Sequence, residues 1–164
     1  MLSLWTFFDS INAQDSISQR LGIQFSYHPY DFFSGLHYER EKGNHQHQML
    51  VSVGVNSTFF QRRCYPQFGY QYGFHLIKNK HFQAGPFVRI LSSMRKIDKH
   101  ATHGMSFNED LFLGAYFGTG MKHRLRLSIG IGPSAEHNWS VLANKYQAYW
   151  SWNYIGEISY AYAL

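Results

Sequence analysis

Cysteine and charge are both scarce in this sequence. Its 164 residues include a single cysteine, Cys64, which excludes an internal disulfide and cannot by itself build a metal site. Charged residues make up 15% of the chain, whereas an ordinary soluble domain has about 25%. The sequence also has no run of about 20 apolar residues, so no transmembrane helix is expected.

Aromatic residues and glycine are abundant instead. The chain has 12 Tyr, 14 Phe, 4 Trp and 14 Gly, a composition that favours strands and tight turns over helices. The length predicts one domain. A membrane β-barrel is compatible with this composition, because the polar face of each strand dilutes the hydropathy average. The net charge of +5 does not predict nucleic-acid binding, because the Lys and Arg residues form no clustered stripe.

The first 14 residues are predicted to be a signal segment, truncated at its start. Residues 2–8 are an apolar run, and Ala13 followed by Gln14 is a candidate cleavage site, although the usual positive charges at the start are missing. An amphipathic N-terminal helix is the alternative. The Ala-Gln pair resembles the corresponding site in exported proteins of the Bacteroidota. Residues 15–164 are then the mature domain.

From residue 20 onward, the chain is a series of period-two segments separated by turn residues. We predict eight strands, at 20–28, 33–41, 47–57, 66–77, 82–93, 110–121, 124–135 and 148–163. The connections at 59–65, 94–109 and 136–147 are long, and the others are short turns. Long and short connections alternate along the chain. Only the first connection, 28–31, departs from this alternation, because it is short where a long one is expected. This pattern predicts an all-β, eight-stranded antiparallel up-and-down barrel.

The two faces of the predicted strands differ sharply. In residues 124–132, RLRLSIGIG, every second residue is Leu or Ile, and the residues between them are Arg, Ser or Gly. A soluble barrel would turn its large apolar side chains inward and coat its outer wall with Lys, Glu and Thr. Here that outer wall would be mostly Gly and Ser. We therefore expect the sparse, charged face to line the lumen and the aliphatic face to contact lipid.

Charged residues on the inward face are expected to form one paired network, because unpaired buried charges cost several kcal/mol each. The expected members are Arg20, Glu39, Arg89, Arg126 and Glu157. Glu39 and Glu157 are predicted to pair with Arg89 and Arg126. Closure of the barrel between the first and last strands is predicted to bring Glu157 near Arg20 or Gln24.

Aromatic residues lie at both ends of the last strand, as two membrane interfaces select. They are Trp150, Trp152 and Tyr154 at one end, and Tyr160 and Tyr162 at the other. With this last strand, residues 20–164 resemble the small eight-stranded outer-membrane β-barrel family, although the chain ends in Leu164 rather than in an aromatic residue. The resemblance implies an outer-membrane location, short periplasmic turns and longer extracellular loops. No cofactor is expected.

The long loops hold the candidate functional residues. Loop cations are predicted to contact lipopolysaccharide phosphates or a cell-surface partner; these are Arg62, Arg63, Arg95, Lys96 and Lys99. A weaker alternative is a lipid A deacylase-like enzyme that uses His103, Ser106 and Glu109. A third candidate function is that of a soluble, lipocalin-like ligand carrier. No metal site is expected, because the His45/His47 turn and the loop containing His100 and His103 lie at opposite barrel ends.

The favoured function is therefore structural or adhesive. The barrel is expected to be a monomer, or a subunit of an envelope complex, that displays its loops outside the cell. An eight-stranded lumen is filled by side chains, so porin-like flow is not expected.

Overall fold

The computed structural model describes residues 18–60, 64–79, 81–99, 102–120, 122–140 and 145–164. The predicted signal segment lies outside these residues. The elements are β1 (Ser18–Tyr27), β2 (Phe32–Lys42), β3 (His45–Gly54), the π-helical turn η2 (Asn56–Phe60), β4 (Pro66–Phe74), β5 (Ile77–Lys78), β6 (Phe82–Lys99), β7 (Thr102–Thr119), β8 (His123–Ser140) and β9 (Lys145–Ala163). No helix in the described part of the chain is long and apolar enough to span a membrane.

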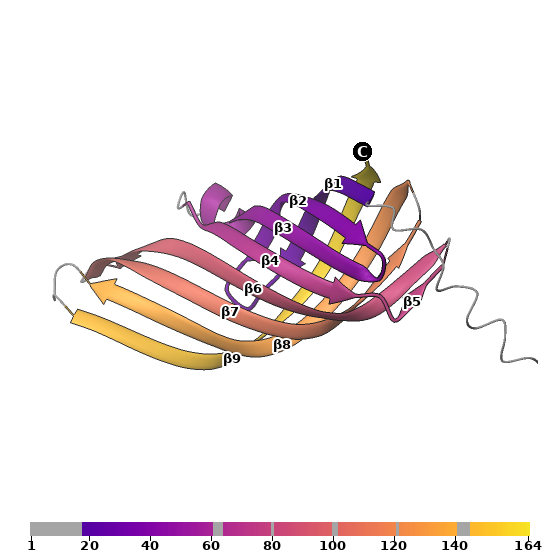
Figure 1. Ribbon diagram of the computed structural model, residues 1–164. Helices are drawn as coiled ribbons and strands as arrows, with labels where there is room; N and C mark the ends of the chain where they lie inside the picture. Colours follow the sequence, from indigo (N-terminus) through magenta and orange to yellow (C-terminus); the bar gives the residue numbers. More distant parts are fainter. Residues whose placement is uncertain (1–17, 61–63, 80, 100–101, 121, 141–144) are drawn as a thin grey trace, which may run out of the picture.

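The strands form one closed antiparallel sheet (Figure 1). Each strand pairs with its neighbours in sequence, and β1 closes the barrel against β9 from the pair Arg20↔Ala163 to the pair Tyr27↔Gly156. Both β4 and β5 pair with β6, and the register between these two pairings shifts by one residue, which marks a β-bulge. Since β4 and β5 are one interrupted strand, the barrel has eight strands, and the predicted fold class is confirmed.

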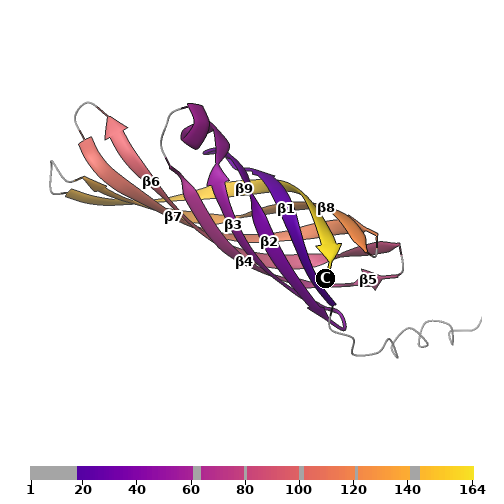
Figure 2. The ribbon, with the colours of Figure 1, turned by 90° about the horizontal axis from the view of Figure 1, so that it is seen from above.

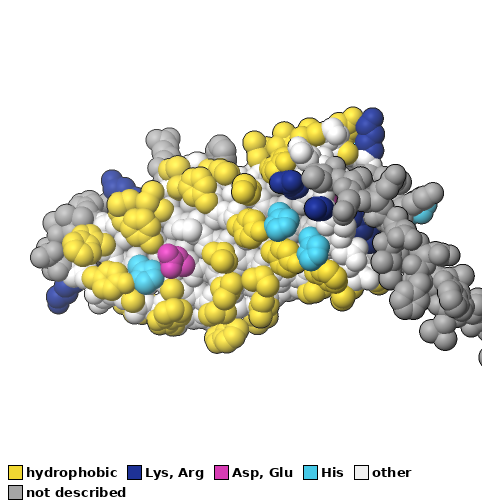
Figure 3. Space-filling model, in the orientation of Figure 1, with side chains coloured by type: hydrophobic (Ala, Val, Ile, Leu, Met, Phe, Trp, Pro, Cys, Tyr) yellow, Lys and Arg dark blue, Asp and Glu magenta, His cyan; other side chains and the backbone are white. Residues whose placement is uncertain are grey.

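The apolar side chains point outward. In the segment that carries the RLRLSIGIG pattern, Leu127 and Ile129 are 49% and 70% exposed, whereas Arg126 is 1% exposed. Figure 3 shows apolar side chains spread over the outer wall, with few charged ones among them. The strand parity therefore places the polar residues in the lumen, as the sequence predicts.

The predicted loops 94–109 and 136–147 are mostly strand, which corrects the sequence-based boundaries. β6 continues to Lys99, β7 begins at Thr102, β8 continues to Ser140 and β9 begins at Lys145. Here the inward positions hold small polar residues such as Ser106 and Asn108, and the sequence resembles a loop. The outward Met105 and Phe107 keep the period of two.

These longer strands form a four-stranded extension beyond the closed part of the barrel (Figures 1 and 2). The last pair between β6 and β4 is Ser93↔Gln67, and the last pair between β9 and β1 is Gly156↔Tyr27. The ladders β6–β7 and β8–β9 run on to Lys99↔Thr102 and Ser140↔Lys145. The short first connection is explained, because β1 and β2 end at the barrel rim and take no part in the extension.

Candidate functional site

The lumen and its mouth hold most of the buried polar side chains. At the end nearest the β2–β3 hairpin, Glu39 and Glu41 lie between arginines from β1 and β8. Arg20 Nη1 lies 3.1 Å from Glu39 Oε1 and 3.0 Å from Glu41 Oε2. Arg124 Nη1 lies 2.5 Å from Glu39 Oε1 and also contacts Glu41. Two carboxylates and two guanidinium groups thus form one buried ionic cluster.

A second ionic cluster adjoins the first. Arg126 Nη1 lies 3.1 Å from Glu39 Oε2, and its Nη2 lies 3.5 Å from Glu157 Oε1. Arg89 Nη1 donates to Glu157 Oε2 at 2.6 Å, and Arg89 Nε donates to Gln71 Oε1 at 2.8 Å. Arg126 therefore connects the two clusters across the lumen.

The network differs from the predicted one in its partners. Glu157 pairs with Arg89 and Arg126, as the sequence suggests, but Arg20 binds Glu39 and Glu41 instead of Glu157. Closure places Glu157 opposite Ser26, two residues from Gln24 on the same face of β1 but six residues from Arg20.

Two members, Glu41 and Arg124, were not among the predicted network residues. Their inward parity was visible in the sequence. Their pairing was not, because they are 83 residues apart.

Apolar side chains fill another part of the lumen. The cluster consists of Leu50, Phe87, Leu91, Phe112, Tyr116 and Ile155. Glycines give these rings room: a Cβ on Gly114 would lie 2.6 Å from Phe87 Cζ, and one on Gly130 would lie 3.1 Å from the same atom. Together with the ionic clusters, this packing occupies the interior, as expected for an eight-stranded barrel.

The mouth is organised around the β1–β2 connection. Asp31 accepts hydrogen bonds from the backbone N–H groups of Asn56 and Ser57 at 3.0 and 2.8 Å, so it anchors η2 to the rim. His28 is 2% exposed, and its ring packs edge-on against Phe33 with centroids 5.0 Å apart. Burial, reinforced by the positive charge of Arg89, lowers the pKa of His28 to about 3.

Polar side chains continue from the mouth onto the inner face of the extension. Asn153 Nδ2 donates to Asp110 Oδ1 at 3.1 Å and to the Tyr30 hydroxyl at 3.0 Å. Asn108 Nδ2 donates to the Tyr65 hydroxyl at 2.8 Å. The inner face is therefore tied to the barrel rim by side-chain hydrogen bonds.

The structure places two residues of the candidate catalytic site, Ser106 and Glu109, on opposite faces of β7. Ser106 points to the inner face and is fully buried, with its hydroxyl 3.1 Å from Glu136 Oε1. Glu109 is three residues further along β7 and is exposed on the outer face, because residues an odd number apart on a strand face opposite ways. The side chain of His103 lies outside the described residues.

The predicted loop cations are dispersed. Arg95 turns to the inner face, where Nη2 lies 3.0 Å from Glu136 Oε1 and the guanidinium lies over the Tyr30 ring. Lys96 is exposed on the outer face. Arg62, Arg63 and the side chain of Lys99 lie outside the described residues.

The aromatic residues of β9 lie on the outer wall, as their parity requires. Trp150 and Trp152 are 77% and 74% exposed, and Tyr154, Tyr160 and Tyr162 are also exposed. At the turn end of the barrel, outward histidines pair with tyrosines: His47 Nδ1 lies 2.6 Å from the Tyr70 hydroxyl. Sequence reasoning considered His45 and His47 only as metal ligands. The signal that was missed is that His45 and His47 of β3 share the outward face with Tyr70 and Tyr72 of the neighbouring strand β4.

No protein-family model matches this sequence, and no curated protein matches it. Among solved structures, the N-terminal β-barrel domain of Pseudomonas aeruginosa OprF is similar, with a TM-score of 0.62 and 5% sequence identity over 90% of this chain and 97% of that one. A major outer membrane protein from Thermus thermophilus has a TM-score of 0.52 and 9% identity over 91% of this chain and 100% of that one. At such identities the likeness concerns the fold, which is that of an outer-membrane β-barrel.

Proposed function

We propose that this protein is an integral outer-membrane β-barrel with a plugged lumen, and that it serves as a rigid platform for its mouth and extension. The observation that carries the proposal is the inverted distribution of side chains. Leu36, Val51 and Leu113 are each more than half exposed, whereas Glu39, Arg89 and Gln71 are buried in the lumen.

An aqueous environment is a poor match for this outer wall. Soluble monomers rarely expose contiguous apolar patches beyond a few hundred Å², and each Å² left in water forgoes about 25 cal/mol. A lipocalin-like carrier would need an empty, accessible interior. Here the interior holds ion pairs and aromatic rings, so the soluble-carrier alternative lacks a place for its ligand.

The platform role is supported by how the mouth is built. Asp31 holds η2 on the rim, and side-chain hydrogen bonds hold the extension to it. A preorganised surface of this kind loses little conformational entropy when a partner binds. Lipopolysaccharide or a cell-surface protein is the proposed partner, and the outer cation Lys96 is a candidate contact for the phosphates or carboxylates of that partner.

Heat modifiability tests membrane-barrel formation. The detergent-extracted chain is expected to migrate differently on an SDS gel before and after boiling, and to require detergent for solubility. Unchanged mobility together with solubility in plain buffer would contradict the proposal.

Lipopolysaccharide binding tests the platform role separately. Vesicles with and without lipopolysaccharide in the outer leaflet are compared for protection of the extension against protease. Lipopolysaccharide is expected to slow cleavage, and Lys96→Glu is expected to weaken that effect. Equal cleavage in both vesicle types would remove lipopolysaccharide as the partner.

A further inference from the structure

The outer surface beside the β2–β3 hairpin carries a group of basic side chains that the platform role does not use. Strand β2 alternates in charge there: Glu39 and Glu41 point into the lumen, whereas Arg40 and Lys42 are exposed on the outer wall. The acids of this segment are therefore withdrawn from the surface, and the bases remain on it.

Strand register brings two histidines beside these bases. Lys42 lies opposite His45, and Arg40 lies opposite His47. Side chains directly opposite each other on one face have Cβ atoms about 5 Å apart. Arg40, Lys42, His45 and His47 thus occupy two consecutive rungs, and we call them the basic patch.

The two cations of the basic patch have no ion-pair partner among the described residues. Within the described part of the chain, no carboxylate oxygen lies within ion-pair distance of Arg40 or Lys42. The nearby Lys78 is already engaged, because its Nζ donates to the Gly43 carbonyl at 2.5 Å and lies 3.9 Å from Glu41. Two adjacent cations without a counter-charge are electrostatically unfavourable, and an external anion would relieve that repulsion.

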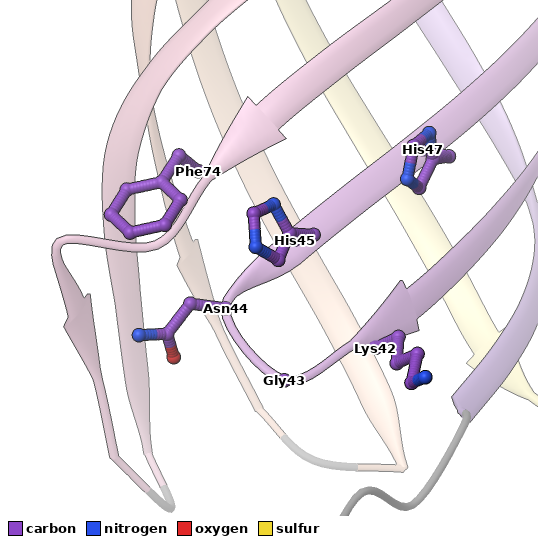
Figure 4. A pocket seen from close by; sticks show the side chains of 6 residues that line it. All are labelled: Lys42, Gly43, Asn44, His45, His47 and Phe74. Atoms are coloured by element: carbon purple, nitrogen blue, oxygen red, sulfur yellow. The ribbon is translucent and has the colours of Figure 1, made fainter. Parts of the chain in front are cut away.

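Both histidines of the basic patch are held by tyrosines. His45 Nδ1 lies 2.6 Å from the Tyr72 hydroxyl, and His47 Nδ1 lies 2.6 Å from the Tyr70 hydroxyl. When the hydroxyl donates to Nδ1, the neutral imidazole carries its hydrogen on Nε2. Nε2 is then a donor for an acceptor outside the protein. Lys42, His45, His47 and Phe74 are among the residues that line a pocket of about 550 Å³ at the hairpin, and Figure 4 shows their side chains.

The outer wall changes character steadily from the basic patch toward the middle of the barrel. The next rung consists of Tyr38, Met49 and Tyr70, and the one after it of Leu36, Val51 and Phe68. Successive outward rungs are about 7 Å apart. Cations, aromatic rings and aliphatic chains therefore follow one another in the order of the phosphate, the glycerol region and the acyl chains of a phospholipid.

We propose that the basic patch binds the phosphodiester headgroup of a membrane phospholipid, whose acyl chain lies along Met49, Val51 and Phe68. Arg40 and Lys42 neutralise the phosphate, and the two imidazoles donate to its oxygens. A free phosphate would engage the cations but leave the apolar rungs unused. The proposal rests on the membrane location proposed above.

The test uses the full chain, folded in detergent micelles and titrated with phosphatidylglycerol, and lipid adducts are counted by native mass spectrometry. The test variant is Arg40→Gln with Lys42→Gln. The matched control is Lys122→Gln with Lys145→Gln, which removes the same charge from exposed positions outside the basic patch. The wild type and the control are expected to retain the lipid, and the test variant is expected to bind it about tenfold more weakly.

Equal lipid retention by all three proteins would overturn the proposal. Displacement of the lipid by equimolar inorganic phosphate would overturn the assignment to a lipid, because a free anion would then suffice. Heat-dependent gel mobility of the same samples separates the two proposals. A mobility shift without selective lipid loss refutes the lipid site alone, whereas unchanged mobility together with solubility in plain buffer refutes the membrane barrel and, with it, the lipid site.

Discussion

The charged side chains in the lumen depend on one another through ion pairs. Glu157 is the shared partner of Arg89 and Arg126, at 2.6 and 3.5 Å, and all three are almost completely buried. Removal of Glu157 leaves Arg89 charged with no carboxylate partner among the described residues and leaves Arg126 with Glu39 alone, which is more costly than loss of the whole group.

Glu157→Leu is accordingly expected to lower the free energy of unfolding by about 3–5 kcal/mol, because buried Arg89 loses its carboxylate and buried Arg126 keeps only Glu39. Urea unfolding of the barrel from vesicles measures the change. The control is Lys96→Gln at an exposed position, where about 0.5 kcal/mol or less is expected. A Glu157→Leu barrel as stable as the wild type would show that the pair is not buried as described.

His28 gives the barrel a pH dependence of its own. Its pKa is lowered to about 3 by burial and by Arg89, whereas the unfolded chain has a pKa of about 6.5. Between these values only the unfolded state gains the proton, so stability falls as the pH falls. The loss should be about 1.4 kcal/mol per pH unit below about 6.5.

His28→Gln removes this titration, so urea unfolding of both proteins from pH 8 to pH 4 isolates it. The difference in free energy of unfolding between wild type and variant should be constant above about pH 6.5. Below that value the wild type should lose stability relative to the variant. A difference that stays constant over the whole range would mean that His28 is hydrated in the folded barrel.

At the scale of the element, parity could be predicted from the sequence and strand ends could not. In a strand such as 124–132, successive side chains point to opposite faces. Once the face of one apolar side chain is known, the faces of all the other residues of the strand follow. Strand ends depend on whether a partner strand continues. The polar inner residues Ser106 and Asn108 gave β7 the appearance of a loop, although β6 and β8 extend alongside it.

Two inward glycines on β7 offer a matched test of lumen packing. A Cβ on Gly114 would lie 2.1 Å from the Ile129 carbonyl oxygen and 2.6 Å from Phe87 Cζ, whereas one on Gly118 meets nothing closer than 3.6 Å. Gly114→Ala is therefore expected to destabilise the barrel by about 1–3 kcal/mol. Gly118→Ala should be neutral or slightly stabilising. Equal effects in urea unfolding would contradict the packing around Phe87.

The extension should be separable from the barrel. The pairings that close the barrel end at Ser93 of β6 and Gly156 of β9, so the extension contributes no closing contact. Replacement of residues 96–105 by Asn-Gly, a favoured hairpin turn, is expected to leave heat-dependent gel mobility intact. If the shortened chain no longer folds, the extension is part of the folding unit.

At the scale of the whole molecule, the composition of the lumen could be anticipated, but only some of its contacts could. The inward position of Glu39, Arg89 and Arg126 follows from parity, and the predicted pairing of Glu39 with Arg126 is present. Contacts such as that of Glu41 with Arg124, 83 positions apart, depend on barrel closure and tilt. The basic patch was missed for the same reason, because its cations and histidines adjoin only through the β2–β3 register.

The central claim is that the aliphatic face contacts lipid. The most direct measurement places a spin label at Ile129→Cys in a Cys64→Ser background, reconstitutes the barrel in vesicles, and compares relaxation by oxygen with relaxation by a water-soluble nickel chelate. Ile129 is 70% exposed on the outer wall, so oxygen is expected to relax the label strongly and the chelate weakly. Strong relaxation by the chelate would show that this face meets water, and would contradict the membrane assignment.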